Sequence, residues 1–220
     1  MSTSAPPPSI DGRNLRAQRT REAVAEALLD LLQRGVLRPT AIQVAARAGV
    51  SERAVFRHFD DLEGLIATVA QQQIQRVAPQ FSQRIPPDCS LPERINTLVT
   101  RRAALYERIT PVRRAALLQE PFSTAVAQRL GWWRDRLRTE VAQVFAPELA
   151  RLPVALRREV LDALGAATSW SVWENLRRHA RLSRRRAERA VIRMATALLE
   201  MPRESRRVRP STARRNLPPS

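Results

Sequence analysis

Two helix-start signals lie close together in residues 40–65, and they constrain the fold more than any other feature of the sequence. Thr40 is a favourable N-cap, and Gln43 three residues later completes a capping box. Gly49 is suited to end this first helix in a left-handed conformation, and Ser51 can cap a second short helix almost at once. Two short helices joined by so tight a turn predict a helix-turn-helix, in which the second helix enters the major groove of DNA.

The same stretch resembles the DNA-binding module of TetR-type transcriptional repressors. The resemblance rests on the pattern V-A-x-x-A-G-V-S-x-x-x-V-F-x-H-F-x-x-L-E-x-L, which runs from Val44 to Leu65. Two positions depart from the family pattern: Leu62 stands where a phosphate-contacting Lys is usual, and Phe56 replaces the usual Tyr. The resemblance implies a three-helix DNA-binding head, followed by a helical body that binds a small molecule and dimerises.

Hydrophobic periodicity along the whole chain predicts an all-α protein of about nine helices, because no strand pattern of useful length occurs. The helices are expected over about residues 15–34, 41–48, 51–59, 62–77, 91–109, 111–120, 123–145, 154–179 and 183–201. The predicted organisation is a disordered N-terminal arm (1–13), a helix-turn-helix DNA-binding domain (14–61), a helical ligand-binding and dimerisation domain (62–201) and a disordered basic tail (202–220).

The positive charge of the chain does not by itself predict DNA binding. The formal net charge is +17, and all 38 basic residues are arginines. Residues 1–65 carry nine arginines against eight acidic residues, whereas residues 177–220 carry 14 against three. Because the excess lies away from the helix-turn-helix, the prediction of DNA binding depends on the motif.

The second helix of the motif is long enough to present about two turns of side chains to the bases. Arg53 is the best candidate for a base contact, because a guanidinium group can bind guanine O6 and N7 together. Arg57 could do the same or bind phosphate, Glu52 could accept from cytosine N4, and Ala54 could touch a thymine methyl group. The resemblance implies further contacts with the DNA backbone. The complete set of predicted DNA-binding residues is Thr40, Gln43, Ser51, Glu52, Arg53, Ala54, Phe56, Arg57 and His58.

The body is unusually rich in large aromatic residues, which either line an apolar ligand cavity or form ordinary core. The resemblance implies a pocket there, and the candidate ligand-binding residues are Tyr106, Phe122, Trp133, Trp170 and Trp173. In the resembled family the last two helices of each subunit form a four-helix dimer interface. The corresponding candidates are Leu164, Thr168, Val172, Leu176, Val191, Met194 and Leu198, unless these helices pack only within the subunit.

The composition offers little for catalysis or for metal binding. The chain has no Lys for a Schiff base, a single Cys, two His on distant segments and only six Gly, none in a phosphate-binding loop. We therefore expect no enzymatic activity, no cofactor and no metal. No apolar run is long enough for a transmembrane helix, and the N-terminus lacks the apolar segment of a signal peptide, so we expect a cytoplasmic protein.

These features together predict a homodimeric transcriptional regulator. Its partners would be double-stranded DNA with a palindromic operator and a largely apolar small-molecule effector, and in the resembled family the effector releases a repressor from DNA. The alternative is a ligand-independent and largely non-specific DNA-binding protein of the nucleoid type, which would use the basic tail. The alternative predicts steep salt dependence and little sequence preference.

Overall fold

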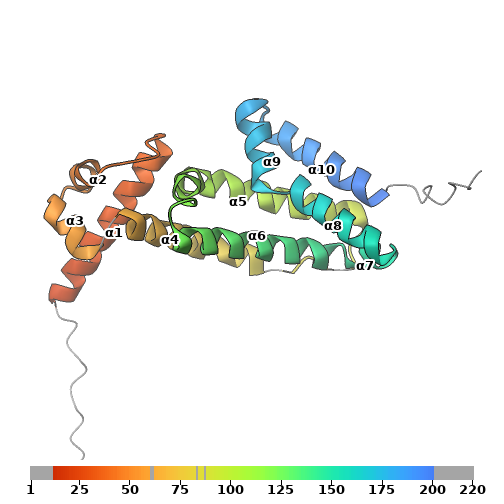
Figure 1. The fold of residues 1–220 in the computed structure, drawn as a ribbon, viewed down its shortest axis with the longest axis horizontal. Helices are drawn as coiled ribbons and strands as arrows, with labels where there is room; N and C mark the ends of the chain where they lie inside the picture. The colour runs from red at the N-terminus through yellow and green to blue at the C-terminus, as the bar shows by residue number, and fades with distance from the viewer. Residues whose placement is uncertain (1–11, 60–61, 83, 87, 201–220) are drawn as a thin grey trace, which may run out of the picture.

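The computed structural model describes residues 12–59, 62–82, 84–86 and 88–200, and every regular element within these ranges is helical. The molecule is elongated, with α1–α3 forming a head at one end and α4 leading from it into a body made of the remaining helices (Figure 1). The elements are α1 (Gly12–Gln33), α2 (Ala41–Ala48), α3 (Glu52–His58), α4 (Leu62–Ser82), α5 (Leu91–Gln119), α6 (Thr124–Val144), α7 (Ala146–Ala150), α8 (Val154–Ala167), α9 (Trp170–Glu174), a π-helical turn (Asn175–His179) and α10 (Arg184–Glu200).

The two predicted ends of the chain fall largely outside the described residues. The predicted basic tail, residues 202–220, lies wholly outside them, as do residues 1–11 of the predicted arm. The last two residues of that arm belong to α1, which therefore begins three residues before the predicted start.

Local capping builds the helix-turn-helix as its sequence predicts. The Thr40 hydroxyl accepts the Gln43 N–H at 3.2 Å, and the Gln43 amide oxygen accepts the Thr40 N–H at 2.9 Å. Gly49 ends α2 with φ +67°, a left-handed conformation that glycine adopts without steric cost. Ser51 then caps α3 by accepting the Ala54 N–H at 3.2 Å. The capping box and the turn are both confirmed.

A single apolar cluster holds the head together and also includes residues of α4 and α5. Its members are Val24, Ala25, Ala27, Leu28, Leu32, Val44, Ala45, Val55, Phe59, Leu65, Ile66, Val69, Val112 and Ala115. An ion pair between Arg47 of α2 and Asp30 of α1, 2.8 Å long, adds a surface link. The head is thus packed directly against the first helices of the body.

A second apolar cluster fills the body between α5, α6, α8, α9 and α10. The largest side chains completely withdrawn from water are Leu98, Leu105, Tyr106, Phe145 and Leu164. Burial of an aliphatic or aromatic side chain of this size contributes about 1.5–3 kcal/mol, so this cluster is the main source of stability in the body.

The helices of the body differ from the predicted ones in two places where proline was expected to interrupt a helix. Pro111 was expected to begin a new helix, but α5 runs through it without a break. Pro111 has no backbone N–H and so cannot make the helical hydrogen bond of its position. The hydroxyl of the preceding residue, Thr110, donates an additional hydrogen bond to the Tyr106 carbonyl at 2.6 Å. Pro79 likewise lies inside α4, which continues to Ser82 rather than ending near residue 77.

The helix predicted over residues 154–179 is wrong, because the chain breaks at Thr168 and Ser169 into α8 and α9. The Thr168 carbonyl accepts hydrogen bonds from Tyr106, at 2.8 Å, and from Arg102, at 3.1 Å. Ser169 then caps α9 by accepting the Val172 N–H at 3.3 Å. Tertiary hydrogen bonds thus overrule the hydrophobic period. The short helix α7 was not predicted, although Pro147 suits its first turn.

Candidate DNA-binding helix and ligand cavity

One face of α3 is exposed and carries charged and aromatic side chains. Glu52, Arg53, Phe56 and Arg57 are all exposed, whereas Val55 on the opposite face is 1% exposed. Neither Arg53 nor Arg57 has an ion-pair partner among the described residues, so both guanidinium groups are available to bases or phosphates. This face has the composition of a major-groove reader.

The other predicted DNA-binding residues surround this face but are less available. Thr40, Gln43 and Ser51 are exposed, yet the oxygens of their side chains are engaged in the helix caps. Ala54 is half-buried. His58 is also half-buried, and its Nε2 is enclosed without a hydrogen-bond partner among the described residues, so that atom does not face a surface phosphate.

Sequence reasoning missed an exposed apolar residue beside this face. The apolar residues Ile42, Val44, Ala45 and Ala48 suggest from the sequence that Ile42 faces inward, but its side chain is 65% exposed, and Phe56 on α3 is 49% exposed. The buried positions of α2 are Ala41, Val44 and Ala45, and the spacing of these positions leaves Ile42 off the buried stripe. The same spacing could have been recognised in the sequence. The helix-turn-helix therefore carries two exposed apolar side chains in addition to its arginines.

The body contains a cavity of about 360 Å³ between α4, α5 and α6. Its volume lies within the range of about 300–1,000 Å³ that is usual for small-molecule sites. Most of the wall is aliphatic or aromatic, and none of the described lining residues is acidic. The wall is formed by Gly64, Ile66, Ala67, Ala70, Gln73, Ile74, Leu105, Ile109, Val112, Arg113, Ala116, Ala125, Val126, Arg129, Leu130, Trp133 and Leu137.

Only one of the five predicted ligand-binding residues, Trp133, lines this cavity. Tyr106 and Trp173 are 2% and 3% exposed and belong to the body core. Trp170 is also buried, and its indole N–H donates to the Thr110 hydroxyl at 2.9 Å. Phe122 is 83% exposed in the turn between α5 and α6. The aromatic concentration in the sequence therefore mainly reflects packing, and the cavity wall is mostly aliphatic.

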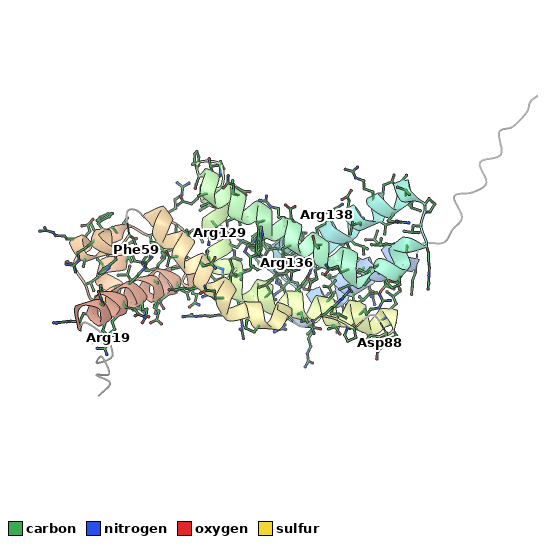
Figure 2. All side chains as sticks on the ribbon, turned by 90° about the horizontal axis from the view of Figure 1, so that it is seen from below. Arg19, Phe59, Asp88, Arg129, Arg136 and Arg138 are labelled. Carbon is green, nitrogen blue, oxygen red and sulfur yellow. The ribbon has the colours of Figure 1, made fainter. Side chains whose placement is uncertain are left out.

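Three polar side chains reach the wall of the cavity. Arg129 of α6, labelled in Figure 2, donates to the Ala67 carbonyl at 3.3 Å and to the Gln71 amide oxygen at 2.9 Å, so it links α6 to α4. Gln73 is 8% exposed, and its amide makes no hydrogen bond with any described residue. Arg113 lies with its guanidinium carbon 5.1 Å from the centre of the Trp170 ring. Burial lowers the pKa of Arg113 below its ordinary value.

The helix α4 is shared between the head and the cavity. Leu65 and Val69 are buried in the apolar cluster of the head, whereas Ala67 and Gln73 line the cavity. Ile66 belongs to both sets. Any change in the shape of the cavity wall on α4 therefore bears directly on the packing of the DNA-binding head.

The predicted dimer interface must be corrected at three of its seven positions. Leu164, Thr168 and Val191 are 0%, 2% and 5% exposed, so they are core residues of the subunit. Thr168 is held there by its hydroxyl, which donates to the Leu164 carbonyl at 2.7 Å and accepts from Arg102 at 2.6 Å. The remaining candidates are half-buried and reach the surface in part: Val172, Leu176, Met194 and Leu198.

Two other kinds of site are absent from the described part of the chain. No cluster of three or more His, Cys, Asp or Glu side chains there is arranged to hold a metal ion. None of the described helices is both long and apolar enough to cross a membrane.

Comparison with known proteins finds relatives both in sequence and in fold, although no protein-family model matches the chain. The chain is 31% identical over 164 residues to an uncharacterized HTH-type transcriptional regulator of Mycobacterium bovis, covering 68% of this chain and 83% of the relative. An uncharacterized HTH-type regulator of Mycobacterium tuberculosis matches to the same extent.

Two crystal structures share the fold at 19% sequence identity. A transcriptional regulator from Rhodococcus sp. Rha1 superposes with a TM-score of 0.64, over 81% of this chain and 95% of the other. A TetR-family transcriptional regulator from Streptomyces coelicolor superposes with a TM-score of 0.63, over 82% of this chain and 80% of the other. Both similarities extend well beyond the head into the helical body.

Proposed function

Because this chain belongs to the TetR family of helix-turn-helix transcriptional regulators, we propose that it is a repressor that an effector in the body releases from a palindromic operator. The observation that carries this proposal is the position of α4. One face of α4 packs in the core of the head, and the other lines a cavity of ligand size. The DNA-binding function of such a regulator also agrees with the expected cytoplasmic location.

The DNA-binding half of the proposal assigns base contacts to the exposed face of α3. Arg53 is free of ion pairs and can bind guanine O6 and N7 through two parallel hydrogen bonds. Arg57 can extend that contact or bind phosphate, and Phe56 offers an exposed ring to the sugars or to a thymine methyl group. The buried face, with Val55, holds the helix in position on the rest of the head.

The effector half of the proposal uses α4 as the moving element. A ligand in the cavity presses on the part of α4 that carries Ala67, Ala70 and Gln73. It also disturbs the hydrogen bonds that Arg129 of α6 donates to α4. Displacement of α4 then shifts the head, because Leu65 and Val69 are packed in its core. The effector lowers DNA affinity only to the extent that it binds the displaced conformation more tightly than the DNA-bound one.

A dimer is required because one short helix reads only a few base pairs. Two subunits place their reading helices in successive major grooves, about 34–36 Å apart, and their two-fold symmetry demands a palindrome. We propose that the four partly exposed candidates, Val172, Leu176, Met194 and Leu198, contribute to the subunit contact. Sedimentation of the protein over a range of concentrations tests this: a Met194→Glu variant that remains folded should shift toward monomer, and an unchanged dimer would contradict the assignment.

Selection of DNA from a random pool by the purified protein tests the function most directly. An enriched palindrome with half-sites about one helical turn apart, or a multiple of it, is the expected result. Binding without enrichment, which disappears steeply as salt rises, would instead identify a non-specific DNA-binding protein.

The selected operator then allows a test of α3. Arg53→Ala should weaken operator binding by about 1–3 kcal/mol and relax the preference at one base pair of each half-site. Arg136→Ala, at an exposed arginine on α6, removes the same charge from the body and serves as the control. Equal operator affinity for Arg53→Ala and Arg136→Ala would refute the base-reading role.

A further inference from the structure

Three arginines of α5 turn their guanidinium groups inward, and two of them are paired with carboxylates, although the Nε of Arg102 has no hydrogen-bond partner among the described residues. Arg94 binds both carboxylate oxygens of Glu148, at 2.9 and 2.5 Å. Arg102 binds the carboxylate of Glu140 at 3.0 Å, the Thr168 hydroxyl at 2.6 Å and two backbone carbonyls. Each of these buried cations is neutralised within the subunit, as a buried charge requires.

The third arginine, Arg113, lines the cavity and has no such partner. No described carboxylate pairs with it, and its Nε is buried without a hydrogen-bond acceptor. Its nearest covering group is the ring of Trp170, whose face attracts a cation but cannot replace a carboxylate as an acceptor. Glu120, the acidic residue in its electrostatic surroundings, is already paired with Arg134.

We propose that the effector of this regulator is an amphipathic anion whose carboxylate binds Arg113 and whose apolar part fills the rest of the cavity. The inference rests on the proposed function, in which this cavity receives the effector, and it adds the chemical class of the ligand. The Gln73 amide, buried and without a hydrogen bond to any described residue, provides a second polar contact for the same group. Trp133, Leu130 and Leu137 provide the apolar wall for the body of the ligand.

The charges of the wall discriminate between ligand classes. The lining includes two arginines and no acidic residue, so a cationic ligand would meet repulsion in a poorly hydrated space. A neutral ligand would leave the Arg113 guanidinium desolvated and unpaired, which costs free energy in a buried site. An anion removes that penalty and gains hydrogen bonds of the strong, charge-assisted kind.

The test uses the full chain and two sets of probes matched in shape and different in charge. One set is decanoate, decan-1-ol and decylamine, and the other is 1-naphthoate, 1-naphthol and 1-naphthylmethylamine, all measured by isothermal titration calorimetry. We expect at least one acid to bind more tightly than its alcohol and its amine. Arg113→Met should weaken binding of that acid about 10- to 100-fold and leave binding of the alcohol nearly unchanged. Arg108→Met, at an exposed position of the same helix, is the matched control and should bind the acid as wild type does.

Several results would overturn the proposal. These are an alcohol or amine that binds wild type as tightly as its acid in both sets, binding of neither acid, or acid binding that Arg113→Met leaves intact. The wild-type comparison within each set does not depend on the folding of any variant.

The result is also separable from the proposed function, because no DNA enters these titrations. Operator selection that succeeds while both acids fail to bind would refute only the ligand class. Arg113-dependent acid binding without any enriched operator would refute only the repressor.

Discussion

The inward-facing arginines of α5 differ in whether a carboxylate pairs with them. In the first half of α5, Arg94 and Arg102 lie in a closed region where each pairs with a carboxylate and also donates hydrogen bonds to carbonyls of α6 or of the α8–α9 junction. Near its end, Arg113 faces a cavity next to α4 and the head. The hydrogen bonds that Arg94 donates to Glu148 raise the pKa of Arg94, whereas burial lowers the pKa of Arg113.

This difference separates a neutralised part of the body from the part that we propose to respond to the effector. In the closed region, Arg94 donates hydrogen bonds to the carbonyls of Cys89 and Val144 and to the carboxylate of Glu148. This region therefore serves as a fixed support for the helices around it. The cavity region lacks an acceptor for one cation and lies against the helix that also packs in the head. We therefore expect regulation where the subunit is incompletely packed and incompletely neutralised.

The largest expected effect is on the closed end. Glu148→Leu leaves the Arg94 guanidinium buried without its carboxylate, and the free energy of unfolding should fall by about 3–5 kcal/mol in urea denaturation. Asp162→Leu is the control, because it removes the carboxylate of an exposed pair with Arg138, and it should cost no more than about 1 kcal/mol. Equal losses for the two variants would show that the closed end is not a tightly coupled polar site.

A smaller effect is expected at the link across the cavity. Arg129→Leu removes the hydrogen bonds from α6 to Ala67 and Gln71 of α4, and it should lower the free energy of unfolding by about 1 kcal/mol. Amide hydrogen exchange in α4 should rise more than exchange in α8, which takes no part in these hydrogen bonds. Unchanged exchange in α4 would mean that Arg129 does not hold the two helices together.

The pH dependence of stability should also distinguish the two ends. Burial tends to raise the pKa of Glu148, but its hydrogen bonds and the charges of Arg94 and Arg151 together lower that pKa below its ordinary value of 4.5. The folded state then binds the Glu148 proton less tightly than the unfolded state. The stability that this carboxylate contributes is therefore present above pH 4.5 and is lost as the pH falls through the lowered pKa. Urea denaturation between neutral and acidic pH should show this loss in wild type, and Glu148→Gln should flatten the part that is due to this group.

The smallest effect on stability is expected at Arg113. Arg113→Met replaces an unpaired buried cation by an apolar side chain, so the loss of its contact with Trp170 is offset by the removal of a desolvated charge. The free energy of unfolding should stay within about 1 kcal/mol of wild type or rise. A loss as large as that of Glu148→Leu would show that Arg113 has a structural partner and would remove the contrast between the two ends.

The head could be predicted closely from the sequence because its signals are local. The capping box at Thr40, the left-handed Gly49 and the cap at Ser51 each act within four residues, and all three appear as predicted. The one error in the core pattern, Ile42, came from treating the apolar run of α2 as continuous instead of following the helical period. The reading face of α3 follows from the same period.

The body could be predicted only in outline, because long-range contacts decide its details. The break at Thr168 depends on hydrogen bonds from Arg102 and Tyr106, more than 60 residues earlier in the chain. The ligand-binding residues were predicted from the concentration of aromatic side chains, and two of them, Trp170 and Trp173, belong to the body core. No periodicity separates Arg113 from the other inward-facing arginines of α5, and only the absence of a carboxylate partner among the described residues distinguishes it.

In the proposed function, occupancy of the cavity controls the DNA-binding head through α4, and this control can be measured without knowing the effector. Val126→Phe places a ring from α6 into the cavity, which Val126 lines, and leaves the residues of α3 unchanged. Its affinity for the selected operator is measured by fluorescence anisotropy under conditions in which circular dichroism shows a folded protein. We expect operator affinity to fall by at least about tenfold, as effector binding would cause. A folded Val126→Phe variant that retains wild-type operator affinity would contradict this control of the head by the cavity.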